Sequence, residues 1–209
     1  MRCISPVDVV RKLPSGINER VKAPCGRCNF CLESRREQWS FRLSQELKVS
    51  SSAKFLTLTY APEFIPRDDC GFPTLDKRDV QLFIKRLRER HKAYSGETVR
   101  YYAVGEYGSE TKRPHYHAIV FNLHNDILGK LSDVWDKGHV HVGEVSPASI
   151  HYVTGYVINR FSDISDGDRA PPFALMSRRP GLGQNYVRTH AKWHLDDMRN
   201  YTRVNGFLS

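Results

Sequence analysis

The stretch Arg113-Pro114-His115-Tyr116-His117-Ala118-Ile119-Val120-Phe121 carries two histidines, one residue apart, at the head of an apolar run. Successive side chains of an extended strand point to opposite faces, which gives one face to His115, His117, Ile119 and Phe121 and the other to Tyr116, Ala118 and Val120. At a rise of about 3.3 Å per residue, the two histidines lie about 7 Å apart along the strand. The stretch therefore predicts a strand with two imidazoles side by side on one face.

Two imidazoles on a rigid element can chelate a divalent cation if an acidic residue from a neighbouring strand completes the set. Glu106, in Gly105-Glu106-Tyr107-Gly108 just upstream, is the expected donor. A lone His-x-His is more often a pair of polar positions on a half-buried strand, so this interpretation depends on the rest of the chain. A histidine-triad nucleotide hydrolase would carry a third histidine where this chain has Ile119, which disfavours that class.

The composition favours a polyanionic partner. The 209 residues include 32 Lys and Arg against 23 Asp and Glu, a formal net charge of +9 at pH 7, and their number suits one principal domain with a small appendage. Binding to phosphates releases counterions, so nucleic acid is the first candidate partner. An apolar run of 18 residues and a secretion signal are both lacking, so we expect no membrane contact and a reducing cytoplasm.

Four of the five cysteines lie near the N-terminus, at Cys3, Cys25, Cys28 and Cys31. In a reducing compartment they are not expected to form disulfides. The turn in Cys25-Gly26-Arg27-Cys28 folds back, so two thiolates can converge on one ion, and all four cysteines would make a closed structural zinc site. An iron–sulfur cluster and unliganded thiols are the alternatives. Cys70, alone in a predicted loop, is expected to take no part.

Hydrophobic periodicity predicts helices over residues 32–48, 76–93, 125–135 and 148–161, and strands over 54–60, 99–104, 115–121 and 139–145. Residues 1–24 are predicted to be irregular because prolines and glycine interrupt them. Ser146-Pro147 is the cap-then-proline signature of a helix start. In the helix that follows, one row is the expected core face (Val153, Val157, Phe161), and the row about 100° round can face a site (Tyr152, Tyr156, Arg160).

Three polar features allow two interpretations each. The basic face of the 76–93 helix is either solvated or a DNA track. The turn from Ser177 to Gly183 could present guanidinium and backbone N–H groups to a phosphate, or be an ordinary surface turn. His190 and His194 lie four residues apart on a predicted helix, a spacing that can bind zinc. Without the glutamate of a zinc-protease motif we interpret them as structural.

Three of these features, in this order, resemble the motifs of the HUH endonucleases: the strand at 55–60, the His115-Tyr116-His117 pair with Glu106 upstream, and the Tyr152-x-x-x-Tyr156 helix. The chain is similar to replication initiators of single-stranded DNA bacteriophages of the microvirus type, particularly gokushovirus-like ones. Those proteins also contain stretches that resemble Pro24-Cys25-Gly26-Arg27-Cys28 with Cys31 and Trp39, and residues 176–183. The resemblance covers nearly the whole chain.

The resemblance implies an α+β fold with a central antiparallel sheet of about five strands, flanking helices and an N-terminal Cys-rich zinc-binding segment. It implies three regions. Residues 1–48 are a zinc-binding segment and a helix packed on the nuclease, residues 49–165 the HUH endonuclease core, and residues 166–209 a C-terminal extension of the same domain that contacts DNA.

The resemblance also implies a function, that of a rolling-circle replication initiator in the cytoplasm of the bacterial host. Such an enzyme nicks and rejoins single-stranded origin DNA through a covalent 5′-phosphotyrosine, with Tyr152 or Tyr156 as nucleophile, and leaves a 3′-hydroxyl for host polymerase; host helicase is a further expected partner. Mn²⁺ or Mg²⁺ would be held by His115, His117 and Glu106, in addition to the structural Zn²⁺. The expected DNA contacts are Arg113, Arg160, Arg178 and Arg179.

The chain departs from the family pattern in two places. Members with two tyrosines usually carry a lysine three residues after each, and this chain has Gly155 and Asn159 there, so Arg160 is the expected replacement cation. Relatives continue beyond residue 209, which favours a nuclease-domain fragment. The alternative function is a non-catalytic, zinc-containing nucleic-acid-binding protein whose histidines and tyrosines contact bases.

Overall fold

The structure, a computed structural model, describes residues 3–159, 169–196, 198, 203–204 and 207–208, and a five-stranded antiparallel sheet forms its centre. The strand order is β6-β3-β5-β4-β7. The strands are β3 Ala53–Tyr60, β4 Arg100–Tyr107, β5 Pro114–Phe121, β6 Gly138–Glu144 and β7 Phe173–Met176. The histidine stretch is thus the middle strand. The expected α+β fold with a five-stranded sheet is confirmed.

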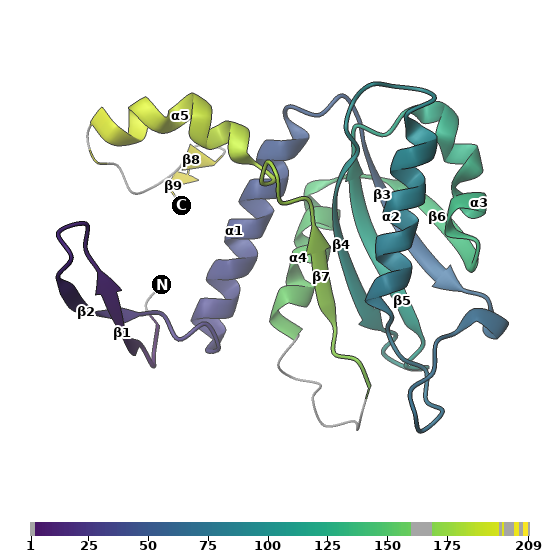
Figure 1. The fold of residues 1–209 in the computed structure, drawn as a ribbon, viewed down its shortest axis with the longest axis horizontal. Coiled ribbons are helices and arrows are strands. Elements are labelled where there is room, and N and C mark those ends of the chain that lie inside the picture. Colours follow the sequence, from purple (N-terminus) through teal and green to yellow (C-terminus); the bar gives the residue numbers. More distant parts are fainter. Residues whose placement is uncertain (1–2, 160–168, 197, 199–202, 205–206, 209) are drawn as a thin grey trace.

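Helices cover both faces of the sheet (Figure 1). One face carries α2 Lys77–His91, the 3₁₀ helix η2 Asn125–Lys130 and α3 Leu131–Trp135, and the other carries α1 Asn29–Leu47 and α4 Pro147–Asn159. Tyr116, Ala118 and Val120 of β5 belong to the first core cluster, and Ile119 and Phe121 to the second. The predicted alternation along β5 is therefore confirmed.

The helix ends follow from local capping. Asp76 accepts the Arg78 N–H at 2.7 Å and begins α2. The Ser146 hydroxyl accepts the Ser149 N–H at 3.1 Å, so the predicted cap at the start of α4 is confirmed. The single helix predicted over 125–135 is instead a 3₁₀ turn followed by a short α-helix, with the poor helix former Gly129 in the 3₁₀ part. Val153 is buried as predicted, whereas the Val157 side chain and Phe161 lie outside the described residues.

The prediction of irregular structure for residues 1–24 is wrong for most of this segment. β1 Val7–Lys12 and β2 Asn18–Ala23 form an antiparallel hairpin. The expected breakers make its turn: Gly16 has φ +83°, and the Leu13 N–H donates to the Ile17 carbonyl at 2.9 Å. Its side chains are largely exposed, Val10 by 63%, so a buried core contributes little to holding this hairpin.

The sequence pattern does not predict strand β7, because four residues after Pro171-Pro172 are too short to show a periodicity. It forms by pairing with β4, with Phe173 opposite Gly105. A Cβ at Gly105 would lie 2.8 Å from the Phe173 ring, so the missing side chain lets this edge strand close on the sheet.

The turn from Ser177 to Gly183 joins β7 to α5 Gln184–Asp196 and clasps α1. The Gly183 N–H donates to the Glu46 carboxylate at 2.8 Å, and the Arg42 Nε donates to the Leu182 carbonyl at 3.0 Å. Gly183 has φ +70°, and a Cβ there would lie 2.7 Å from the Arg42 carbonyl oxygen. These groups of the turn therefore serve the fold rather than a phosphate.

Helix α1 lies between the sheet and the two terminal parts of the chain, as Figure 1 shows. On the side away from the sheet are the β1–β2 hairpin, α5 and the small hairpin of β8 Arg203–Val204 and β9 Phe207–Leu208. His190 and His194 of α5 both contact Tyr186, by ring stacking and by a 3.1 Å hydroxyl contact respectively, which agrees with a structural role. Among the described helices, none is both long and apolar enough to cross a membrane.

Candidate active site

The register of β4 and β5 brings Glu106 to the histidine pair. Glu106 lies within β4, beyond the predicted strand end, directly opposite His115. Its Oε1 is 2.7 Å from His115 Nε2 and 2.9 Å from His117 Nε2. The three ligand atoms lie within 4.8 Å of one another, so the set expected from the sequence is assembled in the fold.

The outer nitrogen of each histidine has its own partner. His117 Nδ1 lies 3.0 Å from the Thr57 hydroxyl of β3, and His115 Nδ1 lies 3.2 Å from the Arg113 carbonyl. Such contacts orient a metal-binding imidazole and set which nitrogen is left for the ion. Sequence reasoning missed Thr57, because its partner is chosen by the β3–β5 register.

The charges in this group suit a cation. Burial raises the pKa of Glu106, but hydrogen bonds from His115, His117 and Tyr156 outweigh it and lower that pKa to about 2. Glu106 is therefore an ionised carboxylate at any physiological pH. One carboxylate oxygen and two imidazole nitrogens form a donor set that fits a divalent cation.

Both tyrosines of α4 reach this group. The Tyr152 hydroxyl lies 3.3 Å from Glu106 Oε1 and 3.4 Å from His117 Nε2. The Tyr156 ring stacks against His117 at 6.4 Å and meets the Tyr152 ring edge-on at 5.0 Å. Burial raises the pKa of both phenols, so both are protonated at neutral pH. Tyr152 is 46% exposed, whereas Tyr156 is half-buried.

The expected DNA-contacting arginines are not gathered at one place. Arg113 lies at the start of β5 beside His115 and donates to the Tyr60 carbonyl at 2.5 Å. Arg178 and Arg179 are exposed but follow Ser177, which pairs with Tyr101. Tyr101 is five residues from Glu106 along β4, about 16 Å at the usual strand rise. Arg160 lies outside the described residues.

A guanidinium that the sequence did not point to lies beside the tyrosine row. Gly155, where two-tyrosine relatives usually carry lysine, faces Arg36 of α1, whose Nε would be 3.8 Å from a Cβ at position 155. The Arg36 Nε is buried and has no hydrogen-bond partner among the described residues, and Nη1 makes a 3.5 Å ion pair with Glu33. Packing of α1 against α4, marked by the 2.8 Å contact of the Ser40 and Thr154 hydroxyls, places it there.

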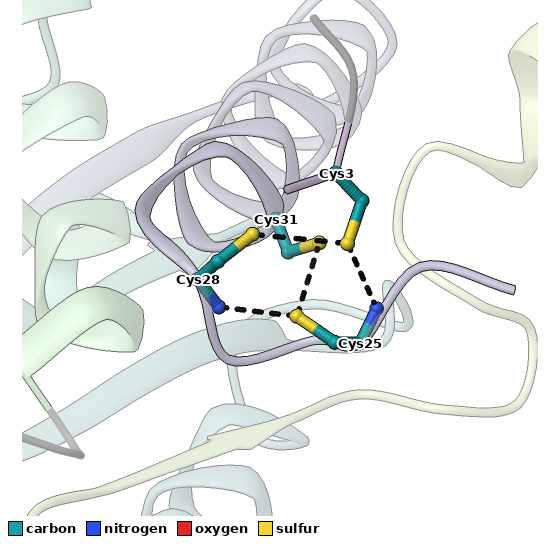
Figure 2. A group of neighbouring side chains, drawn as sticks. All are labelled: Cys3, Cys25, Cys28 and Cys31. Atoms are coloured by element: carbon teal, nitrogen blue, oxygen red, sulfur yellow. Dashed lines mark hydrogen bonds between the residues drawn. The ribbon is translucent and has the colours of Figure 1, made fainter. Parts of the chain in front are cut away.

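The four N-terminal cysteines form a second group of possible metal ligands. Figure 2 shows their side chains pointing toward one another from the ends of three short segments. Cys25 and Cys31 sulfurs are 3.9 Å apart, as are those of Cys28 and Cys3. A tetrahedral ion with metal–sulfur bonds of about 2.3 Å requires sulfurs about 3.8 Å apart. Cys70 is free and exposed, as expected.

Backbone N–H groups favour thiolates in this cysteine group. The Arg27 and Cys28 N–H groups point to the Cys25 sulfur at 3.5 and 3.3 Å and lower the pKa of Cys25. The N–H groups of Ile4 and Cys31 lower the pKa of Cys28 to about 6. A bond from Gly26 lowers the pKa of Cys31, but burial and the neighbouring cysteines outweigh it and raise that pKa to about 12. Crowded thiolates of this kind need a cation to neutralise them.

Comparison with known proteins places these groups in a family context. The model of a family described as replication-associated protein ORF2 matches residues 53–161, which include Glu106, both histidines and both tyrosines. The replication-associated protein VP4 of Bdellovibrio phage phiMH2K is 29% identical over 187 residues, covering 80% of this chain and 58% of VP4. The replication-associated protein ORF2 of Spiroplasma virus 4 is 30% identical over 188 residues, covering 81% of this chain and 58% of that protein.

The replication-associated protein ORF4 of Chlamydia phage 1 is 28% identical over 206 residues, which cover 88% of this chain and 50% of that protein. The chain thus spans little more than half the length of the curated relatives it matches. No solved structure matches the chain.

Proposed function

We propose, because the chain belongs to this family of replication-associated proteins, that it initiates rolling-circle replication of a bacteriophage genome. It would do so in the bacterial host cytoplasm by nicking and rejoining single-stranded DNA at the origin. One observation carries this proposal: the Tyr152 hydroxyl lies 3.3 Å from Glu106 and 3.4 Å from His117, so a nucleophile and a His-His-Glu ligand set meet at one point.

The ligand set would hold Mn²⁺ or Mg²⁺ through His115, His117 and Glu106. When bound, the ion supplies Lewis-acid polarisation of the scissile phosphate. Thr57 keeps the His117 ring in place for this role. With a pKa of about 2, Glu106 is a poor proton acceptor, so its contact with Tyr152 orients the hydroxyl rather than deprotonating it.

The reaction is a transesterification. A bond forms between the tyrosine oxygen and phosphorus, and the bond from phosphorus to the 3′ oxygen breaks. The products are a 5′-phosphotyrosine and a free 3′-hydroxyl that host polymerase can extend, with host helicase opening the duplex ahead. The second phenol, with its ring centroid 5.0 Å from the first, is close enough to attack the regenerated junction after one round.

The division of labour along the chain is part of the proposal. Residues 49–165 would be the HUH endonuclease core, because they carry the ligands and both tyrosines. Residues 1–48 would hold zinc and brace α4 through α1, and residues 166–209 would extend the DNA surface. Arg113, Arg160, Arg178 and Arg179 would contact phosphates, which the net charge of +9 favours.

The test is mass spectrometry of the protein after incubation with Mn²⁺ and single-stranded DNA that carries the phage origin. We expect a covalent DNA adduct on the tyrosine helix and an equal amount of product ending in a 3′-hydroxyl. A binder without chemistry, the alternative function, would retain the DNA but give neither product.

Zinc content tests the N-terminal cysteine group. We expect about one tightly bound zinc per chain, because four thiols at tetrahedral spacing hold together a segment that lacks a core. Chelation should increase hydrogen exchange in residues 3–31 before it does so in the sheet. Cys28→Ser should lose the zinc and Cys70→Ser should keep it. Metal analysis that finds no zinc, or iron with sulfide, contradicts this assignment.

Arg36 offers a cation in place of the missing lysine. We expect Arg36→Ala to slow cleavage about tenfold, because one guanidinium beside the phosphate path is worth about 1–2 kcal/mol when partly buried. Gly155→Lys in the Arg36→Ala background should restore most of the rate, since a side chain at 155 has space once Arg36 is truncated. Single-turnover cleavage measures both. If Gly155→Lys restores nothing, Arg36 acts only through packing.

A further inference from the structure

A pocket of about 240 Å³ lies beside the cysteine group, outside the site described above. It is formed by one side of α1, including Phe30, Ser34 and Gln38, together with the turn at Gly26. These helix residues lie at i, i+4 and i+8. The side that contacts α4 carries Arg36 and Ser40, so the pocket opens on the opposite side of the helix.

The side chains of the pocket suit a flat, polar-edged ring. Phe30 is 40% exposed and presents its ring at the pocket. Arg35 lies over the turn, 3.5 Å from where a Gly26 Cβ would be, and has no ion-pair partner in the part of the chain that the structure describes. Gln38 donates to the Ser34 hydroxyl at 3.4 Å, which leaves its amide oxygen and the hydroxyl proton for a ligand.

This combination is the one that recognises an unpaired base. Aromatic rings and arginine planes stack on bases, and amide and hydroxyl groups bond to base edges. The volume lies below the roughly 300–1,000 Å³ of pockets for drug-sized ligands, so it fits a single ring system. The exposed Arg27 adds positive charge at the same turn for the adjoining phosphate.

We propose that this pocket holds one unpaired base of the single-stranded DNA substrate, at a position away from the scissile phosphate. The substrate class rests on the proposed function. Helix α1, about 10 Å across with its side chains, separates the pocket from the tyrosine helix. The base held here therefore belongs to a nucleotide several positions from the cleavage point, and the cysteine group has a second role as one wall of a DNA site.

The test uses zinc-loaded protein and single-stranded oligothymidylate without added divalent metal, so no cleavage is needed. We expect Phe30→Leu to weaken binding about tenfold, because it removes stacking at nearly constant apolar volume. Phe30→Trp should bind as the native protein does. The salt dependence of binding should not change, since no charge is lost. Gln38→Ala, at an exposed position, should weaken binding several-fold, and zinc content reports that each variant is folded.

A matched control and a crosslinking arm complete the test. Phe72→Leu changes a phenylalanine that is 54% exposed but does not line this pocket, and it should leave binding within about twofold. Ultraviolet irradiation with an oligonucleotide that contains 5-iodouracil should crosslink Phe30. The proposal is overturned if Phe30→Leu and Gln38→Ala bind normally, or if the Phe72 control loses as much. Crosslinking at Phe30 in a protein that never nicks DNA would sustain the pocket and reject the proposed function.

Discussion

His115→Ala and His117→Ala each reduce DNA cleavage by at least about 10³-fold and leave binding of single-stranded DNA within a few-fold. The reason is that a metal ion acts on the transition state, where the loss of several kcal/mol multiplies the barrier effect, while the basic surface carries the affinity. Mn²⁺ should serve at least as well as Mg²⁺, because imidazole nitrogens suit manganese better than the harder magnesium. Single-turnover cleavage and fluorescence anisotropy measure the two effects separately.

The chain supplies a matched control for this experiment. β6 carries a second His-x-His, His139 and His141, exposed on the same face of the sheet but outside the ligand group. His139→Ala and His141→Ala should cleave within a few-fold of the native rate. Thr57→Val, which removes the Nδ1 partner of His117, should raise the metal concentration required by about 10- to 100-fold. Normal cleavage by both ligand variants with any divalent ion would show that the site is wrongly placed.

Simultaneous replacement of Tyr152 and Tyr156 by phenylalanine eliminates the covalent protein–DNA adduct, whereas either single replacement leaves part of it. Both phenols border the ligand group, so each can attack a phosphate held there. Tyr152→Phe should have the larger effect on the first cut, because its hydroxyl is the more exposed and contacts both Glu106 and His117. Tyr156→Phe should affect rejoining more. Denaturing gel analysis of adduct and rejoined product separates the two steps.

Phenylalanine keeps the ring packing on His117, so these variants test the hydroxyls alone. Hydrogen exchange across α4 should stay unchanged and serves as the folding control. An adduct that persists in the double variant would move the nucleophile to Tyr101, Tyr102 or Tyr107. Of these, Tyr102 is fully buried, and the Tyr107 hydroxyl donates to the Ala170 carbonyl at 2.7 Å, so neither is as accessible as Tyr152.

Much of the candidate site could be predicted because its members follow local periodicities. The alternation of two put both histidines on one face of β5, and the helical repeat put both tyrosines on one face of α4. The spacing of Cys25, Cys28 and Cys31 likewise brought three thiols together within one turn and the first turn of α1. The N-terminal hairpin escaped prediction because its proline and glycine were read as breaks, when they form a turn between two strands.

The sequence by itself determined which residues share a face, because the backbone repeat of a strand or helix acts over a few residues. It could not determine which faces meet. Thr57 behind His117, Arg36 across Gly155, Phe173 over Gly105 and the distant thiol of Cys3 are decided by strand register and helix packing. These depend on burying the whole core at once, a free energy summed over segments far apart in the chain. Only the tertiary structure therefore shows which partners each of these residues has.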